Sequence, residues 1–237
     1  EELLIQMPLA REFLDSLNIL YYEDDNIEAD DICGIMAKLA EKEGYDVQIY
    51  TSDKDYLQLI DDKITIELIK KGLKDIHKMT PTSFKEEWGF EPSKIVDYKG
   101  LMGDPSDNLK GIPKVGEKTA KALIQKYGDF ENIIEHVDEL TPALSESIKN
   151  NVDQGKMCKE LAKITLDYEI PYSPNQTIYK GYDFNSISEF SNQHSLRTLM
   201  NKLPKDLRIV SLNEVKVNYE EIDNFNDIDV PLEFGIA

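Results

Sequence analysis

Cysteine, histidine and tryptophan are scarce in this chain of 237 residues, which contains two cysteines, three histidines and one tryptophan. Two cysteines are too few for a disulfide framework, and Cys33 and Cys158 do not have the spacing of a metal site. We therefore expect a reducing, cytoplasmic setting in which both thiols pack as small hydrophobic groups. The three histidines are scattered along the chain, so the sequence predicts no histidine-based chemistry.

Long apolar runs are also absent. No stretch approaches the roughly 20 apolar residues that are needed to span a bilayer, and the first residues lack the basic and apolar segments of a signal peptide. Hydrophobic residues make up 41% of the chain, which is ordinary for a globular protein with a core. The chain begins at Glu1 and not at methionine, so we expect a processed product or a fragment.

Basic residues are in the minority, with 27 against 46 acidic residues and a formal net charge of −19. Taken alone, this balance argues against nucleic-acid binding, which draws its affinity from lysine and arginine. The charge is unevenly distributed, however. Five lysines and one acidic residue lie between Lys110 and Tyr127, whereas seven acidic residues and one lysine lie between Glu214 and Glu233. The acidity is therefore concentrated in a tail and in the clusters described below.

The first part of the chain, residues 1–79, reads as an α/β layer. Apolar residues recur at helical spacing from Ile32 to Ala40, and Gly44 ends that helix. The predicted elements are a helix over Leu3–Leu17, a short buried strand over Ile19–Tyr22, a helix from Ile32, and strands over Asp46–Thr51 and Ile64–Ile69. Strand, helix and strand in this order indicate a mainly parallel sheet.

Residues 80–203 read as a helical region. Thr80 and Pro81 are typical of a helix N-cap and first helical position, and Gly89 follows that helix. The further predicted helices are Pro92–Met102, Glu117–Tyr127, Phe130–His136 and Pro142–Asn150. Residues 204–237 lose helical periodicity and turn acidic, which indicates a linker or the start of a following domain.

Seven acidic residues stand in three clusters at the ends of predicted elements. They are Glu28, Asp30 and Asp31 in the first turn of a helix, Asp53 and Asp55 after a strand, and Asp104 and Asp107 in the sequence GDPSDN. Each cluster has an ordinary structural reading on its own, because acidic residues favour helix N-termini and N-caps, and aspartate is a common turn residue.

The three clusters together favour a metal site. Two carboxylates about 4 Å apart repel each other by roughly 4 kcal/mol at an effective dielectric constant of about 20, and divalent cations relieve that cost. Mg²⁺ and Mn²⁺ prefer oxygen ligands, and two such ions about 4 Å apart suit phosphodiester hydrolysis. Spacing along the chain leaves open whether the clusters converge.

A glycine-bracketed turn, Gly111–Gly116, leads into the predicted helix Glu117–Tyr127. Glycine at both ends would let a phosphate approach backbone N–H groups at the helix start. Lysines in and after the turn would then add charge for a duplex backbone without reading bases. The alternative is a solvated lysine face on an ordinary helical hairpin. The candidate DNA-binding residues are Lys110, Gly111, Lys114, Gly116, Lys118, Thr119 and Lys121.

The strings EADD, TSDKDYLQL and LMGDPSDNLKGIPKVGEKTA, in this order and spacing, resemble the 5′ nuclease domain of bacterial DNA polymerase I and the wider flap endonuclease family. The likeness extends from about Leu3 to about Leu203. It implies a Rossmann-like (PIN-like) α/β core, followed by a helical region with a helix–three-turn–helix element that grips duplex DNA. The implied reaction is metal-dependent hydrolysis of DNA or primer RNA near a junction of single strand and duplex, in replication and repair.

Matching the family's motifs residue by residue implies a set of site residues. Asp30, Asp53 and Asp55 are the implied catalytic carboxylates. The implied ligands of two Mg²⁺ or Mn²⁺ ions are Glu28, Asp30, Asp31, Asp53, Asp55, Asp104 and Asp107. Backbone carbonyls near Ile112 and Val115 resemble the family's K⁺ site. The implied partners are DNA with a 5′ flap or junction and a covalently linked polymerase, and no membrane.

The sequence departs from the family pattern at its beginning. Family members open with a strand and an arch that carry two further metal-binding aspartates and catalytic cations, and none of this precedes Glu1. We therefore expect an incomplete α/β core, and low activity from a polypeptide of this length. The alternative function is a module that binds DNA junctions without cleaving them.

Overall fold

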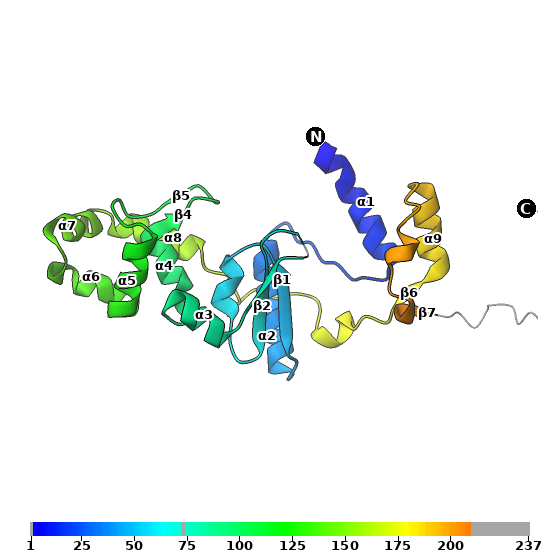
Figure 1. Cartoon of the computed structure of the whole chain (residues 1–237), viewed down its shortest axis with the longest axis horizontal. Helices are drawn as coiled ribbons and strands as arrows, with labels where there is room; N and C mark the ends of the chain where they lie inside the picture. The colour runs from blue at the N-terminus through cyan, green and yellow to red at the C-terminus, as the bar shows by residue number, and fades with distance from the viewer. Residues whose placement is uncertain (1, 73, 210–237) are drawn as a thin grey trace, which may run out of the picture. The chain divides into compact units, whose positions relative to one another are not determined.

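The computed structural model describes residues 2–72 and 74–209, which form two compact units (Figure 1). One unit comprises Tyr22–Ile178, and the other combines the described residues before and after it, 2–21 and 179–209. The sequence predicted a different division, into an α/β part (1–79), a helical part (80–203) and a tail (204–237), and this division stays a prediction. Most of the acidic tail, residues 210–237, lies outside the described residues.

The Tyr22–Ile178 unit is built on a three-stranded sheet. Its strands are β1 (Val47–Thr51), β2 (Ile64–Ile69) and β3 (Ile76–Met79), in that spatial order. As predicted, the first two strands run parallel, with Val47 opposite Ile64, and helix α2 (Ala29–Lys42) packs on β1. The third strand pairs antiparallel with β2. The carboxyl end of β1 therefore opens directly into the Asp53–Asp55 segment.

The helical part of this unit follows β3. Its elements are α3 (Pro81–Trp88), η2 (Pro92–Lys94), α4 (Ile95–Met102), the two-residue strands β4 (Gly103–Asp104) and β5 (Leu109–Lys110), α5 (Glu117–Tyr127), α6 (Phe130–Glu135), η3 (Val137–Glu139), α7 (Pro142–Asn150), α8 (Val152–Leu161) and η4 (Pro174–Thr177). The predicted cap of α3 is confirmed, because Thr80 Oγ1 accepts a hydrogen bond from the Ser83 N–H and Gly89 ends the helix with a φ of 78°.

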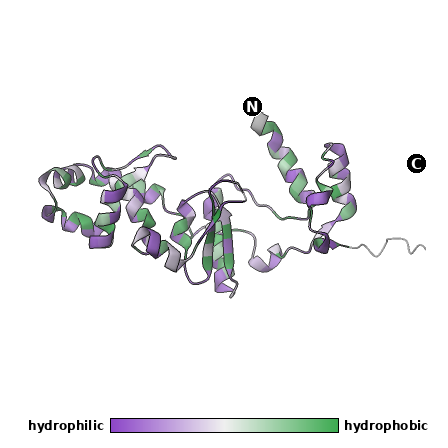
Figure 2. Ribbon diagram, in the orientation of Figure 1, coloured by the Kyte–Doolittle hydropathy of each residue, from purple (hydrophilic) through white to green (hydrophobic). Residues whose placement is uncertain are grey.

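One continuous hydrophobic core joins the sheet to these helices. It runs from Ile64 and Ile66 in β2 to Leu101 in α4 and Phe130 in α6, all of them fully buried. Figure 2 shows the hydrophobic residues gathered in the sheet, beside more polar helix faces. The core therefore fixes the carboxyl end of β1 relative to the end of α4, which are the two places where acidic residues gather.

The second unit has its own small core. Helices α1 (Glu2–Ser16) and α9 (Phe184–Gln193) contact each other around Leu17, Tyr182, Ile187 and Phe190. The remaining elements are β6 (Tyr182–Asp183), η5 (Met200–Lys202), η6 (Lys205–Leu207) and β7 (Arg208–Ile209), and β6 pairs parallel with β7. No helix in the described ranges is both long and apolar enough to cross a membrane.

The predicted strand over Ile19–Tyr22 is wrong. Asn18 adopts a φ of 56°, and the Ile19 N–H donates to the Leu14 carbonyl across 2.9 Å, which is the pattern of a helix C-cap. Ile19 and Leu20 are 38% and 46% exposed. The short apolar run therefore belongs to the termination of α1 and not to the sheet. The spacing of apolar residues in the sequence also did not predict the elements β3, α8 and α9.

Helices α4 and α8 pack closely at two glycines. A Cβ atom on Gly155 would lie 2.4 Å from the Phe130 ring, and one on Gly100 would lie 3.1 Å from the Gly155 carbonyl oxygen. Contacts under 3.0 Å require something to move, and the Phe130 ring is fully buried. Glycine at residue 155 therefore lets α8 lie against the helix that leads to Asp104.

Gly155→Ala should lower the free energy of unfolding by roughly 1–3 kcal/mol, because the added methyl group overpacks against Phe130. Denaturant unfolding followed by circular dichroism measures this change. Lys156→Ala, an exposed change in the same helix, serves as the control and should stay within about 0.5 kcal/mol of the unmodified chain. Equal effects of the two substitutions would contradict the packing account.

Candidate functional site

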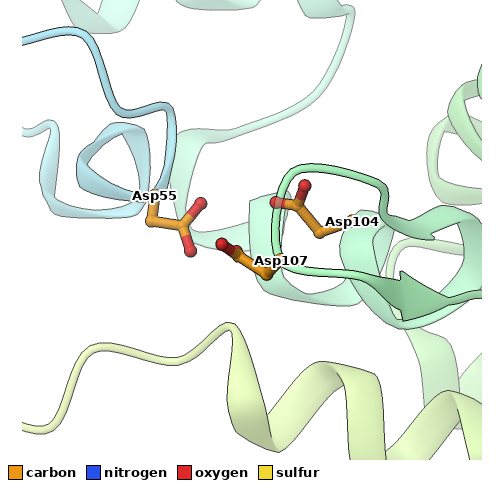
Figure 3. Close-up of side chains that lie close together, drawn as sticks. All are labelled: Asp55, Asp104 and Asp107. Carbon is orange, nitrogen blue, oxygen red and sulfur yellow. The ribbon is translucent and has the colours of Figure 1, made fainter.

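Three aspartates from two separate segments converge in the Tyr22–Ile178 unit. Asp55 begins the 3₁₀ helix η1 (Asp55–Leu59), Asp104 ends β4, and Asp107 lies in the turn between β4 and β5. One carboxylate oxygen of each lies within 4.8 Å of the others. Figure 3 shows the side chains pointing toward one another. The structure thus joins the second and third acidic clusters of the sequence.

Local hydrogen bonds shape both segments. Asp53 Oδ1 accepts from the Asp55 N–H at 2.8 Å, and the Asp53 N–H donates to Thr51 Oγ1 at 3.0 Å. In the second segment, Asp104 Oδ1 accepts from the Ser106 N–H at 2.9 Å. The ordinary reading of these aspartates as turn residues is therefore correct, and it coexists with their convergence.

A buried lysine neutralises part of this acidic cluster. Lys99 Nζ lies 2.5 Å from Asp104 Oδ2 and also contacts Asp55 Oδ1. The side chains of Lys99, Asp55 and Asp104 are only 8%, 12% and 11% exposed. Because water is largely excluded, each charge depends on the others for its stability.

The pKa values of two of the predicted metal ligands, Asp104 and Asp30, shift in opposite directions. Burial alone would raise the pKa of Asp104, but hydrogen bonds from Lys99 and Ser106 and the charge of Lys99 outweigh burial and hold that pKa below its usual range. Burial raises the pKa of Asp30, and the neighbouring charges of Asp31 and Asp53 add to this, against an opposing backbone hydrogen bond. A nearby cation would favour the ionised form of both groups.

The first acidic cluster lines an adjoining pocket. A pocket of about 600 Å³ is bordered by Glu28, Asp30, Asp53, Asp55 and Asp107. A second pocket of about 500 Å³ shares three of these aspartates and adds Asp104. Six of the seven sequence-predicted metal ligands therefore line these two pockets.

Asp31 lies in a different position from the other six acidic residues. Its Oδ1 atom accepts a hydrogen bond from the Thr165 N–H at 2.6 Å, and Asp31 lines neither pocket. Adjacent helical residues point about 100° apart, so Asp30 and Asp31 cannot both face the same space. The structure therefore places Asp31 as a tie between α2 and the segment after α8.

The donor set fits hard divalent cations. Asp55, Asp104 and Asp107 offer only carboxylate oxygens, which Mg²⁺ and Mn²⁺ prefer, and they come from segments that the core holds in place. Glu28, Asp30 and Asp53 extend the set into the neighbouring pocket. The arrangement can therefore hold cations beside a space large enough for a phosphate group.

The glycine-bracketed turn lies directly before α5, as predicted. A Cβ atom on Gly111 would lie 2.1 Å from the Met102 carbonyl carbon, whereas a Cβ atom on Gly116 would meet nothing within 4 Å. Gly111 therefore serves close backbone packing, and Gly116 faces open space at the N-cap of α5. The side chains of Ile112 and Val115 are buried, and the Ile112 carbonyl accepts from the Val115 N–H.

The lysines around this turn differ in their surroundings. Lys110, Lys114 and Lys118 are exposed, and Thr119 is half-buried. Lys121 instead lies 4.3 Å from the centre of the Trp88 ring and 3.0 Å from Glu117 Oε1. Its ammonium group is therefore engaged within the protein, which the sequence did not indicate.

Sequence reasoning missed Lys99 altogether. The signal was the sequence DYKGLM, in which a lysine stands inside a helix whose neighbouring residues are apolar or small. Lysine is almost never fully buried unless it is paired, so its place on the buried face of α4 requires an acidic partner. GDPSDN begins four residues after Lys99 and supplies that partner in Asp104.

Family models match most of the chain. The model described as 5'-3' exonuclease, N-terminal resolvase-like domain, matches residues 1–89, and the model described as 5'-3' exonuclease, C-terminal SAM fold, matches residues 90–185. DNA polymerase I of Bacillus subtilis is 41% identical over 206 residues, which is 86% of this chain and 23% of that protein. The chain thus spans about a quarter of the length of that relative.

A shorter relative matches over most of its length. The 5'-3' exonuclease of Mycoplasma pneumoniae is 35% identical over 202 residues, which is 85% of this chain and 69% of that protein. Among solved structures, T5 5'-exonuclease with bound divalent metal ions (zinc) aligns with a TM-score of 0.53 at 19% identity, over 60% of this chain and 51% of that one.

A second solved structure supports the same architecture. The catalytic core of Rad2 in complex with DNA substrate has a TM-score of 0.51 at 16% identity, over 80% of this chain and 64% of that one. At these identities the likeness concerns the fold: a resolvase-like α/β domain with a helical region after it.

Ca²⁺ in excess over EDTA should raise the melting temperature of the chain, because an ion that binds only the folded state stabilises it by about 2.7 kcal/mol at 100 times its Kd. Asp107→Asn should reduce this rise, since it removes one carboxylate of the triad without breaking the Lys99 ion pairs. Differential scanning calorimetry measures both. Asp62→Asn, an exposed change outside the two pockets, should keep the full rise. No rise in the unmodified chain would contradict a divalent-ion site.

Proposed function

Because this chain belongs to the 5′-3′ exonuclease family, we propose that it hydrolyses phosphodiester bonds of DNA, or of primer RNA, at 5′ ends and 5′ flaps during replication and repair. The observation that carries the proposal is the convergence of Asp55, Asp104 and Asp107 beside a pocket lined by further carboxylates. A surface of this charge repels nucleic acid unless cations occupy it.

The acidic residues have two roles in this proposal. Asp55, Asp104 and Asp107 hold one divalent ion, and Glu28, Asp30 and Asp53 contribute to a second, with Mg²⁺ or Mn²⁺ as the natural choices. When bound, such ions stabilise negative charge on the phosphate and lower the pKa of water. Asp31 fixes the start of α2 through its bond to the Thr165 N–H, and so orients Asp30 and Glu28.

The turn before α5 supplies the duplex contact. Exposed lysines at residues 110, 114 and 118 and the open backbone at Gly116 suit phosphates, and the N-terminus of α5 favours negative charge. Thr119 adds a hydroxyl on the same turn of α5. Lys121 contributes indirectly, by fixing α5 against Trp88. A K⁺ ion held by the carbonyls near Ile112 and Val115 would complete this contact.

The relatives suggest a setting for the activity. DNA polymerase I relatives match the chain over 23% of their own length, which supports a covalently linked polymerase as partner. The substrate is then the 5′ flap or junction that synthesis leaves ahead of a polymerase, in the cytoplasm at the nucleoid.

Asp53→Asn combined with Asp55→Asn should abolish cleavage of a 5′-flap duplex in Mg²⁺ while junction binding in Ca²⁺ remains, because the substitutions remove metal-binding charge and not the lysines. Gel analysis of end-labelled flap substrate measures cleavage, and gel shift measures binding. EDTA is the matched control and should stop cleavage by the unmodified chain. Binding without any cleavage by the unmodified chain would favour a junction-binding module.

Lys118→Met should weaken duplex binding about equally for all sequences and reduce the salt slope of log K by about 1, because an exposed phosphate contact is lost. Lys121→Met is the matched control in the same helix. It should leave the salt slope unchanged and lower the unfolding free energy by roughly 0.5–1 kcal/mol through the lost Trp88 contact. Fluorescence anisotropy across a salt series separates them, and equal salt slopes for both variants would contradict the assignment.

A further inference from the structure

Lys99 is a buried lysine that pairs with two aspartates of the candidate metal site. Its ammonium group lies between Asp55 on η1 and Asp104 on β4, 2.5 Å from Asp104 Oδ2 and in contact with Asp55 Oδ1. Each of these two aspartates also belongs to the triad with Asp107. Lys99 thus pairs with two of the three carboxylates that a cation bound by the triad would use.

The backbone around Lys99 keeps its ammonium group in this place. Lys99 lies on α4, which packs against α8 through Gly100 and Gly155. The β4–β5 hairpin that follows α4 is also bound to α8, because Gln154 Nε2 and Cys158 Sγ both donate hydrogen bonds to the Lys110 carbonyl. The ammonium group and the carboxylates are therefore fixed on one scaffold.

The charges explain why a cation stabilises this cluster. Asp55 and Asp104 are largely buried and Asp107 is exposed, and the carboxylates repel one another when ionised. One ammonium group offsets one of three such negative charges and leaves two. A divalent ion matches that remainder, but at short range it is repelled by Lys99. Lys99 and a divalent ion would therefore compete for the carboxylates of Asp55 and Asp104.

We propose that Lys99 is the built-in counter-ion of this site: it pairs Asp55 with Asp104 when no divalent ion is bound, and it competes with a divalent ion for these two carboxylates. Lys99 is then a positioning residue that keeps the metal-free site assembled and weakens metal affinity. The inference rests on the proposed metal-dependent function, since it concerns the same three aspartates.

Mn²⁺ binding tests the competition directly. Lys99→Met removes the competing charge and keeps most of the length of the side chain, so calorimetric titration with Mn²⁺ should show at least about tenfold tighter binding than the unmodified chain. Lys99→Arg keeps the charge and should bind Mn²⁺ within about threefold of the unmodified chain. Lys159→Met is the matched control: it removes a partly buried lysine of α8 that pairs with Asp97, a residue of α4 like Lys99, and it should leave Mn²⁺ affinity unchanged.

Thermal unfolding supplies a second readout that needs no catalysis. In EDTA, Lys99→Met should melt below the unmodified chain, because Asp55 and Asp104 lose their counter-ion. In saturating Ca²⁺, the difference should shrink or reverse, since the ion takes over the lost charge. A purely structural lysine would lower the melting temperature equally in both conditions, and that result would overturn the proposal.

A measurement on the unmodified chain decides the matter if Lys99→Met does not fold. Acetylation by acetic anhydride, followed residue by residue by mass spectrometry, should modify Lys99 faster in Ca²⁺ than in EDTA, because the ion releases its ammonium group from the aspartates. Lys159 should react at the same rate in both. An equal rate at Lys99 in the two conditions would overturn the proposal.

The outcomes separate this inference from the proposed function. If the unmodified chain and Lys99→Met both bind no Mn²⁺, the proposed metal-dependent function fails and this inference fails with it. If the unmodified chain binds Mn²⁺, and Lys99→Met binds it with equal or lower affinity, only the inference fails.

Discussion

Mutual repulsion of buried carboxylates is the constraint on which the rest of this structure depends. Asp55, Asp104 and Asp107 gather within 4.8 Å of one another, and two of them are largely shielded from water. Folding brings these charges together only because a cation accompanies them, and in the chain itself that cation is Lys99. The site is consequently stable enough to form and yet retains negative charge for a divalent ion.

The scaffold around the site serves this arrangement. The carboxyl end of β1 supplies Asp53 and Asp55, and the end of α4 supplies Asp104, so a single core that joins the sheet to α4 fixes both groups. Helix α8 packs on α4 and binds the Lys110 carbonyl, which steadies the hairpin that carries Asp107. The same hairpin leads into the turn before α5. A carboxylate site and a lysine-bearing turn therefore share one rigid support.

Much of this could be predicted from the sequence, because the signals involved are local. Thr80, Pro81 and Gly89 mark the ends of α3, and the apolar spacing from Ile32 marks α2. The start of α2, the strand end before Asp53 and the turn at GDPSDN likewise placed six carboxylates at the ends of elements, where they line the two pockets. Recognisable motifs in fixed order then identified the family.

The rest depends on contacts that no local pattern encodes. The partners of Lys99 lie on two different elements, and the cation–π contact of Lys121 reaches to Trp88 in α3. Asp31 differs from Asp30 only by its direction on the helix, which decides between Thr165 and the pocket. The apolar residues after Asn18 predicted a strand, because a helix C-cap with exposed apolar residues has the same short hydrophobic signal.

The most direct test of the account is a crystal structure of this chain grown with Mn²⁺, with an anomalous difference map recorded to locate the metal. The account predicts a Mn²⁺ peak in contact with carboxylate oxygens of Asp55, Asp104 and Asp107. A map with no Mn²⁺ at this cluster, and with Lys99 still bridging Asp55 and Asp104 at a saturating concentration of the ion, would contradict it.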